Sequence, residues 1–202
     1  DKQRLFLEEC DKLLDRKGNF MTSFSVIMPT YNRKKMITNA IDSLLCQSYK
    51  IFELIIVDDG STDGTDDFLK KKYEKEISSG IIRYFYQKNS GCCKARNFGL
   101  KMAKNDWIAY LDSDNELAND FLKTMASAIE CNPNAKTFYG KFHAINSDKD
   151  RIVGQEFDFN CLISENFIDL GVFVHHRSVG EQLGGFDENM TRLVDYDLIT
   201  RY

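Results

Sequence analysis

The sequence predicts an α/β protein whose mostly parallel central sheet carries helices on both faces. Three observations predict this fold. Apolar segments of strand length alternate four times with helical stripes along the 202-residue chain, as in parallel sheets. Two of these segments end in acids, Asp58 and Asp59 in one case and Asp112 and Asp114 in the other. Ligands bind at the carboxyl ends of such strands, so these acids mark a candidate site.

The expected elements follow from hydrophobic periodicity and from turn residues. An amphipathic helix at 3–16 comes first and ends at Lys17-Gly18-Asn19. Strands are expected at 24–28, closed by Pro29, and at 52–57, 81–86 and 107–111. Helices are expected at 36–45, through Phe68 and Leu69, at 91–104 and at 117–129. Beyond Pro133 we expect strands at 137–145 and 172–175, a turn at 184–185 and a helix at 195–202.

Composition excludes several classes of protein. The net charge is −4, and the basic residues do not gather in one stripe, which argues against a nucleic-acid binder. No apolar run approaches the ~20 residues of a membrane-spanning helix. The six cysteines form no Cys-x-x-Cys pair, so neither a zinc site nor a thioredoxin-like motif is expected, and reduced thiols are the default.

Asp112 and Asp114 offer the chemistry of a hard-cation site. Oxygen ligands favour Mg²⁺, Mn²⁺ or Ca²⁺ over zinc, and such a cation can bridge two phosphate oxygens. The sequence has no GxxxxGK[ST] loop and no GxGxxG after a strand, so phosphates would have to be held in another way. The alternative is that both acids only cap the following helix.

Other candidates lie at neighbouring strand ends. Asp59 could accept hydrogen bonds from a base or a ribose, although its turn-rich segment also suits plain loop capping. Tyr31 could stack on a base, or be structural. Lys94 and Arg96, at a helix start, could meet a base carbonyl or a phosphate, or stay solvated.

The C-terminal segment adds carboxylates and histidines. Asp195 or Asp197 could act as general base on an acceptor hydroxyl, and either could instead cap a helix. His175 and His176 end an expected strand, where a structural role competes with a phosphate contact or a metal ligand.

These segments, in this order, resemble the family 2 glycosyltransferases, which have the GT-A fold. The resemblance runs from Ser23 to the end of the chain. The matching segments are SVIMPTYNR at 25–33, FELIIVDDGSTDGT at 52–65, SGCCKARNFGL at 90–100, WIAYLDSDNE at 107–116, and LGGFDE with VDYDLITRY within 183–202.

The resemblance implies an inverting, metal-dependent transfer of a sugar from a nucleotide diphosphate, UDP preferred, to a hydroxyl acceptor. Mn²⁺ or Mg²⁺ would be the cofactor, with Asp114 as its ligand. Asp195 matches the catalytic base, and His176 matches a histidine near the diphosphate in some relatives. The expected nucleotide-binding residues are Pro29, Tyr31, Asp59, Arg96, Asp112 and Ser113.

The resemblance also implies a biological setting. The acceptor would be a saccharide or a lipid-linked saccharide, the pathway bacterial polysaccharide or glycoconjugate synthesis, and the location cytoplasmic, or at the cytoplasmic face of the membrane. We expect residues 1–22 to be an N-terminal extension and residues 23–202 a GT-A catalytic domain, truncated before segments that relatives carry. Val194 departs from the family pattern, which often has Glu there, so Asp197 remains a rival base.

Three alternatives compete with this interpretation. A phospho-accepting receiver domain would need its acidic pair after the first strand, whereas here the pair follows the second. A sugar nucleotidyltransferase would need a glycine-rich loop where PTYNRKK stands. A nucleotide-sugar-binding domain without turnover would keep the same acids.

Overall fold

The computed structural model describes residues 22–144 and 150–202. The helix expected at 3–16, and with it almost all of the expected N-terminal extension, lies outside the described residues. A six-stranded sheet in the order β3-β2-β1-β4-β8-β5 forms the centre of the molecule. Its strands are β1 (Phe24–Thr30), β2 (Phe52–Asp58), β3 (Ile82–Tyr86), β4 (Trp107–Tyr110), β5 (Thr137–Tyr139) and β8 (Phe173–His176).

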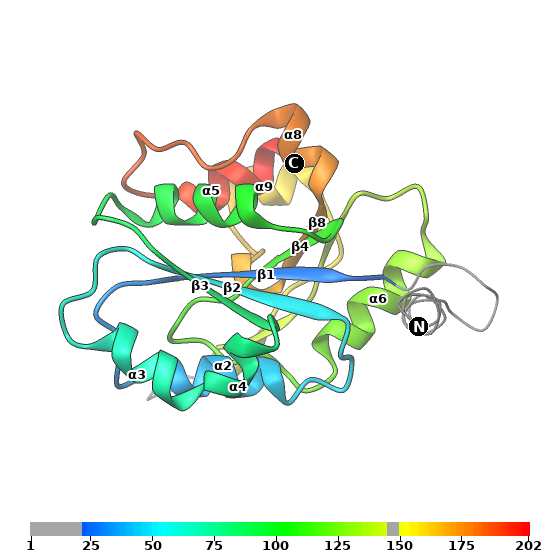
Figure 1. Cartoon of the computed structure of the whole chain (residues 1–202). Helices are drawn as coiled ribbons and strands as arrows, with labels where there is room; N and C mark the ends of the chain where they lie inside the picture. Colours follow the sequence, from blue (N-terminus) through cyan, green and yellow to red (C-terminus); the bar gives the residue numbers. More distant parts are fainter. Residues whose placement is uncertain (1–21, 145–149) are drawn as a thin grey trace.

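Helices cover both faces of this sheet, so the predicted α/β class is confirmed (Figure 1). One face carries α2 (Ile37–Leu45), α3 (Thr65–Lys72), α4 (Glu74–Ser78) and α6 (Phe121–Cys131). The other carries α5 (Cys92–Met102), α8 (Arg177–Leu183) and α9 (Val194–Arg201). Within the described part of the chain, no helix combines the length and the apolar character needed to cross a membrane.

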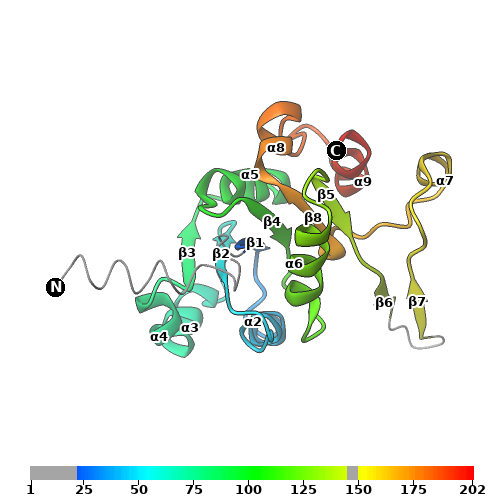
Figure 2. The ribbon, with the colours of Figure 1, turned by 90° about the vertical axis from the view of Figure 1, so that its right-hand side faces the viewer.

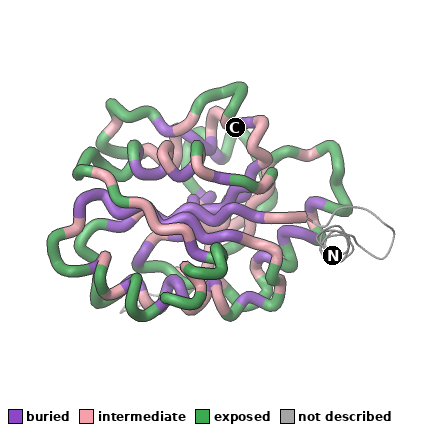
Figure 3. The backbone as a smooth tube through the Cα atoms, in the orientation of Figure 1, coloured by how far each residue is buried: buried purple, intermediate pink, exposed green. Residues whose placement is uncertain are grey.

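Alternation along β1 creates two cores, one on each face of the sheet. Val26 and Met28 pack into the cluster that includes residues of α2 and α6, whereas Ile27 packs into the cluster beneath α5. Side chains alternate between the faces of a strand, so a strand covered on both faces must be apolar throughout. Figure 3 shows the buried backbone concentrated in these central strands.

Strand directions place the candidate site. β3, β2, β1 and β4 run parallel, whereas β8 is antiparallel to both β4 and β5. From β1 the chain first builds outward through β2 and β3, and then crosses to the other side of β1 to form β4. The carboxyl ends of β1 and β4 therefore flank the topological switch point, where open α/β sheets bind ligands.

The first predicted strand is longer than expected, because Pro29 lies inside β1 rather than ending it. The Asp59 amide donates to the Thr30 carbonyl, so the backbone polar groups of Thr30 point toward β2. Those of the preceding residue, Pro29, point toward β4. β4 ends at Tyr110, and its last bond to β1 runs from the Leu111 amide to the Ile27 carbonyl. Pro29 thus sits where no ladder bond requires an N–H.

Helix α6 begins four residues later than the stripe from Leu117 predicts. The Leu117 amide donates to the Ser43 hydroxyl, and the Gln47 side chain donates to the Ala118 carbonyl. These bonds to α2 and its end hold the segment as an irregular loop, even though Leu117 still packs against the core.

The strand expected at 137–145 is two strands in two sheets. β5 pairs with β8 in the main sheet, and after Gly140 and Lys141 the chain continues into β6 (Phe142–Ala144), which pairs with β7 (Arg151–Val153). Figure 2 shows this hairpin and α7 (Phe159–Ser164) projecting from one side of the molecule. A short 3₁₀ helix, η1 (Leu170–Val172), leads back into β8.

Candidate active site

A cavity of about 400 Å³ opens at the carboxyl edge of the sheet. It lies at the switch point, on the side where the loops after β1, β2 and β3 gather at the left of Figure 1. All six predicted nucleotide-binding residues and the predicted metal ligand line it. The lining residues are Pro29, Thr30, Tyr31, Arg33, Asp59, Asn89, Gly91, Cys92, Arg96, Asp112, Ser113 and Asp114.

Asp59 organises the wall of this cavity. One carboxylate oxygen accepts hydrogen bonds from the Gln87 side chain, at 2.7 Å, and from the Ser90 amide, at 2.8 Å. The other oxygen accepts from the Gly91 amide at 2.8 Å. Asp59 is buried, and it fixes the loop that leads into α5. Because each carboxylate oxygen can accept more than one bond, a ligand could still reach the second oxygen.

The adjacent Asp58 has a structural role. Its oxygens accept from the Ser61 amide at 2.7 Å and from the Tyr84 hydroxyl at 2.6 Å, and the residue is fully buried. The Tyr84 pKa is raised, first by burial and then by this carboxylate.

Tyr31 is 48% exposed at the rim of the cavity, where an aromatic face is free to stack.

Arg96 joins the carboxyl end of β4 to the C-terminal helix. Its Nη2 donates to Asp112 Oδ1 at 2.9 Å, and its Nη1 donates to Asp195 Oδ1 at 2.7 Å. Only 5% of Arg96 is exposed, and its guanidinium lies over the Phe186 ring, 5.2 Å from the centroid. The structure thus brings together three predicted site residues that lie up to 99 positions apart in the chain.

Of the two rival bases, Asp195 has the position that suits the role. Asp197 is held by Arg201 one turn further along α9, with Nη2 to Oδ2 at 2.7 Å and Nε to Oδ2 at 3.0 Å. Asp195 lies next to the cavity-lining Arg96, and its side chain stays 36% exposed. A carboxylate oxygen of Asp195 is therefore accessible to an acceptor hydroxyl.

Charges around Asp195 set its proton affinity. Burial raises its pKa, Asp112 and Asp169 raise it further, and Arg96 lowers it, so that the pKa is raised overall. Burial lowers the Arg96 pKa, but the two carboxylates outweigh this and raise it, so Arg96 remains a cation. A carboxylate with a raised pKa is a better proton acceptor near neutral pH.

The chemistry of Asp114 fits a cation that is shared with a substrate. Among the residues described, no group of three or more His, Cys, Asp or Glu side chains forms a metal site. Asp114 is 42% exposed at the rim, with an Arg33 guanidinium nitrogen 3.6 Å from Oδ2. Magnesium-like cations are often held by one or two carboxylates together with phosphate oxygens and waters. One accessible carboxylate is thus compatible with Mn²⁺ or Mg²⁺ arriving with a diphosphate.

The position of His176 requires a correction. β8 is antiparallel to β4, and His176 pairs with Trp107, the first residue of β4. Asp112 lies beyond the other end of β4, roughly 15 Å along an extended chain. His176 instead caps α8, accepting from the Ser178 amide at 3.2 Å. This location does not support the predicted contact between His176 and a diphosphate.

The neighbouring His175 is a buried structural residue. Its Nδ1 lies 3.1 Å from the His176 carbonyl oxygen and its Nε2 lies 2.9 Å from the Tyr110 hydroxyl. A carbonyl oxygen only accepts, so Nδ1 donates, and in the neutral ring Nε2 then accepts from the Tyr110 hydroxyl. Burial lowers the His175 pKa to about 4.

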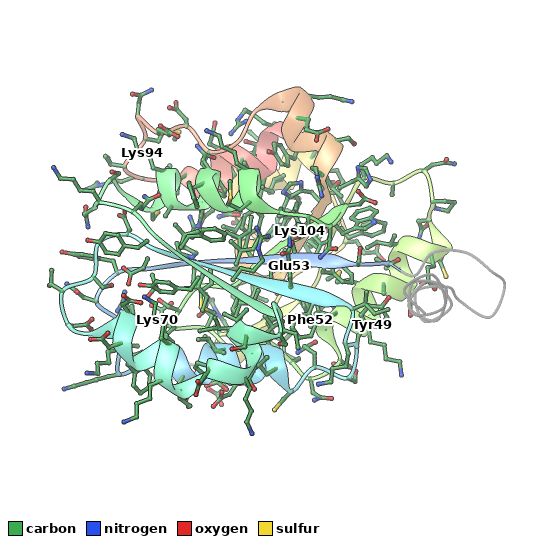
Figure 4. All side chains as sticks on the ribbon, in the orientation of Figure 1. Tyr49, Phe52, Glu53, Lys70, Lys94 and Lys104 are labelled. Atoms are coloured by element: carbon green, nitrogen blue, oxygen red, sulfur yellow. The ribbon has the colours of Figure 1, made fainter. Side chains whose placement is uncertain are left out.

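Several site features were not singled out from the sequence. Arg33 stands two residues after Tyr31 in PTYNR, and a basic residue in that loop was the available signal. Phe186, which lies under Arg96, gave no comparable signal. Lys94, considered together with Arg96, points away from the sheet into solvent (Figure 4). Cys93, at the start of α5, is buried, which raises its pKa to about 11, so it is not an activated thiol.

Known proteins resemble this chain in sequence and in structure. Residues 25–182 match Glycosyl transferase family 2. TuaG of Bacillus subtilis, a putative teichuronic acid biosynthesis glycosyltransferase, is 43% identical over 105 residues, 52% of this chain and 41% of that protein. An uncharacterized glycosyltransferase of Haemophilus influenzae is 28% identical over 184 residues, 88% of this chain and 60% of that protein. The crystal structure of S. aureus TarS 1-349 in complex with UDP has a TM-score of 0.72 and 26% identity, covering 89% of this chain and 54% of that chain.

The six-stranded, mostly parallel sheet with helices on both faces matches the GT-A fold of these structural neighbours. The chain belongs to Glycosyl transferase family 2, as the resemblance predicted. It spans less than two thirds of the length of the relatives described above. The receiver-domain alternative is wrong, because the sheet order is not the 2-1-3-4-5 order of that fold.

Proposed function

We propose that this chain is the donor-binding and catalytic part of an inverting glycosyltransferase that takes a sugar from a UDP-sugar. The observation that carries the proposal is the arrangement of Asp112, Arg96 and Asp195 beside a cavity at the switch point of the sheet. A nucleotide-binding edge and a candidate base are thereby adjacent. The 26% identical S. aureus TarS structure in complex with UDP supports UDP as the nucleotide.

In this proposal the nucleoside lies along the ends of β1 and β2. Tyr31 offers an exposed ring for stacking, and Asp59 holds the loop that shapes the pocket and accepts from the base. Ser113 and Asp112 lie on the ribose side. Asp114 would hold Mn²⁺ or Mg²⁺, which when bound stabilises the negative charge of the leaving diphosphate. The Arg33 guanidinium next to Asp114 offers a further positive charge at the rim.

The reaction then follows from the charges. The acceptor hydroxyl attacks the anomeric carbon from the face opposite the diphosphate, which inverts the configuration. Asp195 accepts the hydroxyl proton as the new carbon–oxygen bond forms. The bond between the anomeric carbon and the diphosphate breaks, and its electron pair leaves with UDP. Holding the two reactants in line supplies up to roughly 7–11 kcal/mol of the barrier reduction in ideal cases.

The acceptor and the setting are part of the proposal. A saccharide or lipid-linked saccharide hydroxyl in polysaccharide synthesis is supported by TuaG, whose description names teichuronic acid biosynthesis. We propose a cytoplasmic location for the reaction, because nucleotide sugars are the donors.

The test is a thermal-shift panel of UDP, GDP and dTDP, each with and without Mn²⁺. A ligand at 100 times its dissociation constant adds about 2.7 kcal/mol of stability, so UDP with Mn²⁺ should raise Tm clearly above either component alone. Asp114→Asn is the matched control, which keeps side-chain size and removes the charge; its response to the metal should disappear.

A protein that responds to none of these diphosphates would overturn the proposal. A response to UDP without hydrolysis or transfer from any UDP-sugar would instead support the binding domain without turnover. The anomeric configuration of the product, read by NMR, tests inversion separately.

A further inference from the structure

Arg96 is placed to control the base rather than the nucleotide. We propose that Arg96 is a positioning residue that holds Asp195 in register with the donor site, a role that rests on the proposed function of that site. The resemblance implied a nucleotide contact for Arg96, but both of its terminal nitrogens already donate to carboxylates of this chain.

The Arg96 side chain is held at both terminal nitrogens and against one face of its guanidinium. Its Nη1 also lies 3.8 Å from Cys92 Sγ, and Phe186 lies against the guanidinium. Phe186 is itself fixed to α5, because its amide donates to Asn97 Oδ1 at 2.8 Å and its carbonyl accepts from Asn97 Nδ2 at 2.9 Å. The Arg96 Nε is buried and finds no hydrogen-bond partner among the described residues. A guanidinium fixed in this way has little freedom to reorient toward a ligand.

Close packing fixes α5 itself on the sheet. A Cβ atom placed on Gly99 would lie 2.5 Å from Ile27 Cγ2, so the helix approaches β1 as closely as glycine allows. Since β1 also contributes Pro29 and Thr30 to the cavity, Arg96 is carried by the same rigid body that forms the donor pocket.

Asp195 is carried by α9, which packs on the core through Leu198 and Ile199. α9 starts directly after Leu193, an exposed residue with a positive φ of 55°. Among the charged groups that act on Asp195, Asp112 and Asp169 repel its carboxylate and Arg96 attracts it. The titratable side chains of Cys93 and Tyr110 also interact with it. The Arg96 bond is therefore the charge attraction that holds the Asp195 carboxylate, in the first turn of α9, toward the pocket.

The fork geometry of arginine matters for this role. A planar guanidinium presents parallel donors to two carboxylates at fixed angles, whereas a lysine ammonium is a single point charge. Arg96→Lys keeps the positive charge in the cluster but cannot hold Asp112 and Asp195 in the same geometry. A misplacement of about 1 Å is enough to cost roughly 100-fold in rate.

The experiment compares Arg96→Lys, Asp195→Asn and the double variant in transfer kinetics and in UDP binding. We expect Arg96→Lys to lower kcat by about 100-fold while the Kd for UDP changes by less than about twofold. The double variant should be no slower than Asp195→Asn alone, because residues that act as a unit are not additive. Asp197→Asn is the matched control: it removes a neighbouring acid from the same helix and should leave kcat unchanged.

Two results would overturn this role. A rise of about tenfold or more in the UDP Kd of Arg96→Lys would make Arg96 a nucleotide contact. Losses that multiply in the double variant would show that Arg96 and Asp195 act independently.

Hydrogen exchange of the α9 amides tests the tether, the bond between Arg96 and Asp195, without an activity assay. Exchange at the start of α9 should rise in Arg96→Lys and also in Asp195→Asn, which leaves Arg96 intact, while the amides of β1 and β2 serve as the folding reference. Unchanged exchange in both variants would refute the tether. A wild-type protein that binds no UDP but shows this exchange pattern would refute the proposed function and keep the contact, so the two failures are distinguishable.

Discussion

An arginine pairs with carboxylates near each end of α5. The two clusters differ in how far hydrogen bonds within the protein occupy the carboxylate oxygens. Near the helix start, Arg96 bridges Asp112 and Asp195, whose side chains are 35% and 36% exposed. Near the helix end, Arg83 donates to Glu53 at 2.7 Å and to the Met102 carbonyl at 2.6 Å. The first cluster lies at the carboxyl edge of the sheet and the second at the amino edge.

The Glu53 cluster is closed. Oε1 accepts from the Ser25 hydroxyl at 2.6 Å and from the Lys104 amide at 2.7 Å, while Oε2 accepts from Arg83. Figure 4 labels Glu53 and Lys104, which this bond to the Lys104 amide holds side by side. Burial raises the Glu53 pKa, but the bonds from Ser25, Arg83 and Lys104 outweigh it and lower the pKa overall.

This difference separates a structural cluster from a candidate functional one. At the amino edge the protein itself satisfies the charged oxygens, so the ion pair joins β1, β2, β3 and α5. At the carboxyl edge the acids keep exposed oxygen and a cavity beside them. Similar residue types thus serve stability in one place and are available for chemistry in the other.

The largest effect on rate is expected from Asp195→Asn. The amide cannot accept the acceptor proton, so kcat for transfer should fall by about 10²–10⁴-fold, with UDP affinity nearly unchanged. Steady-state transfer assays and calorimetric titration with UDP measure the two quantities. Unaltered turnover would show that the open cluster is not the catalytic one.

The open cluster also predicts a pH dependence of rate. Asp195 acts as a base only when it is ionised, so transfer should decline as pH falls through its raised pKa.

The next largest effect concerns stability at the closed cluster. Glu53→Gln leaves the Arg83 charge without its partner and should cost about 3 kcal/mol in the free energy of unfolding. The amide keeps one oxygen for Ser25 and Lys104, but its NH₂ group cannot accept from Arg83. Urea unfolding gives this value. The UDP Kd of the folded variant should stay unchanged, and a loss of UDP affinity at equal stability would contradict the proposed separation of the clusters.

An effect of similar size, but one that appears only at low pH, is expected from His175, the buried neutral histidine between the two edges. Its pKa is about 4 in the folded protein and about 6.5 in an unfolded chain. As pH falls, His175 is protonated in the unfolded chain at a higher pH than in the folded protein. Its contribution to the free energy of unfolding is therefore complete above pH 6.5 and is lost as pH falls toward 4. The loss totals about 3 kcal/mol.

Unfolding of wild type and His175→Gln between pH 7 and pH 4.5 measures this contribution. The glutamine still offers an acceptor to the Tyr110 hydroxyl but does not titrate. Its stability should therefore decline less steeply over this pH range. Equal slopes in both proteins would show that His175 is not the responsible group.

Sequence alone predicted the parallel half of the fold well. Periodicity located β1, β2, β3 and β4 and the longer helices between them, because β1, β2 and β4 are buried almost throughout and these helices pack one apolar stripe. The position of the acids at the carboxyl ends of β2 and β4 could be predicted because they directly follow those strands in the sequence. Their common edge followed from the parallel direction.

Prediction was weaker where the pattern depended on distant contacts. The stripe from Leu117 continues a helical pattern, but the bond between its amide and Ser43 keeps the segment irregular. The run at 137–145 looked continuous, but Gly140 bonds to the Val172 carbonyl and the chain then leaves the main sheet. Local pattern does not contain these bonds, because their partners are more than 30 positions away.

What the sequence determined by itself is the fold class, the acidic carboxyl edge and the candidate nucleotide-binding and metal-binding residues. Their strands and motifs are local features of the chain. The tertiary structure decided which acid of α9 reaches the site and which histidine does not. It also decided that Arg96 holds two carboxylates. The reason is geometric: β8 returns antiparallel and carries His176 to the far edge, while α9 brings Asp195 to Arg96 of α5.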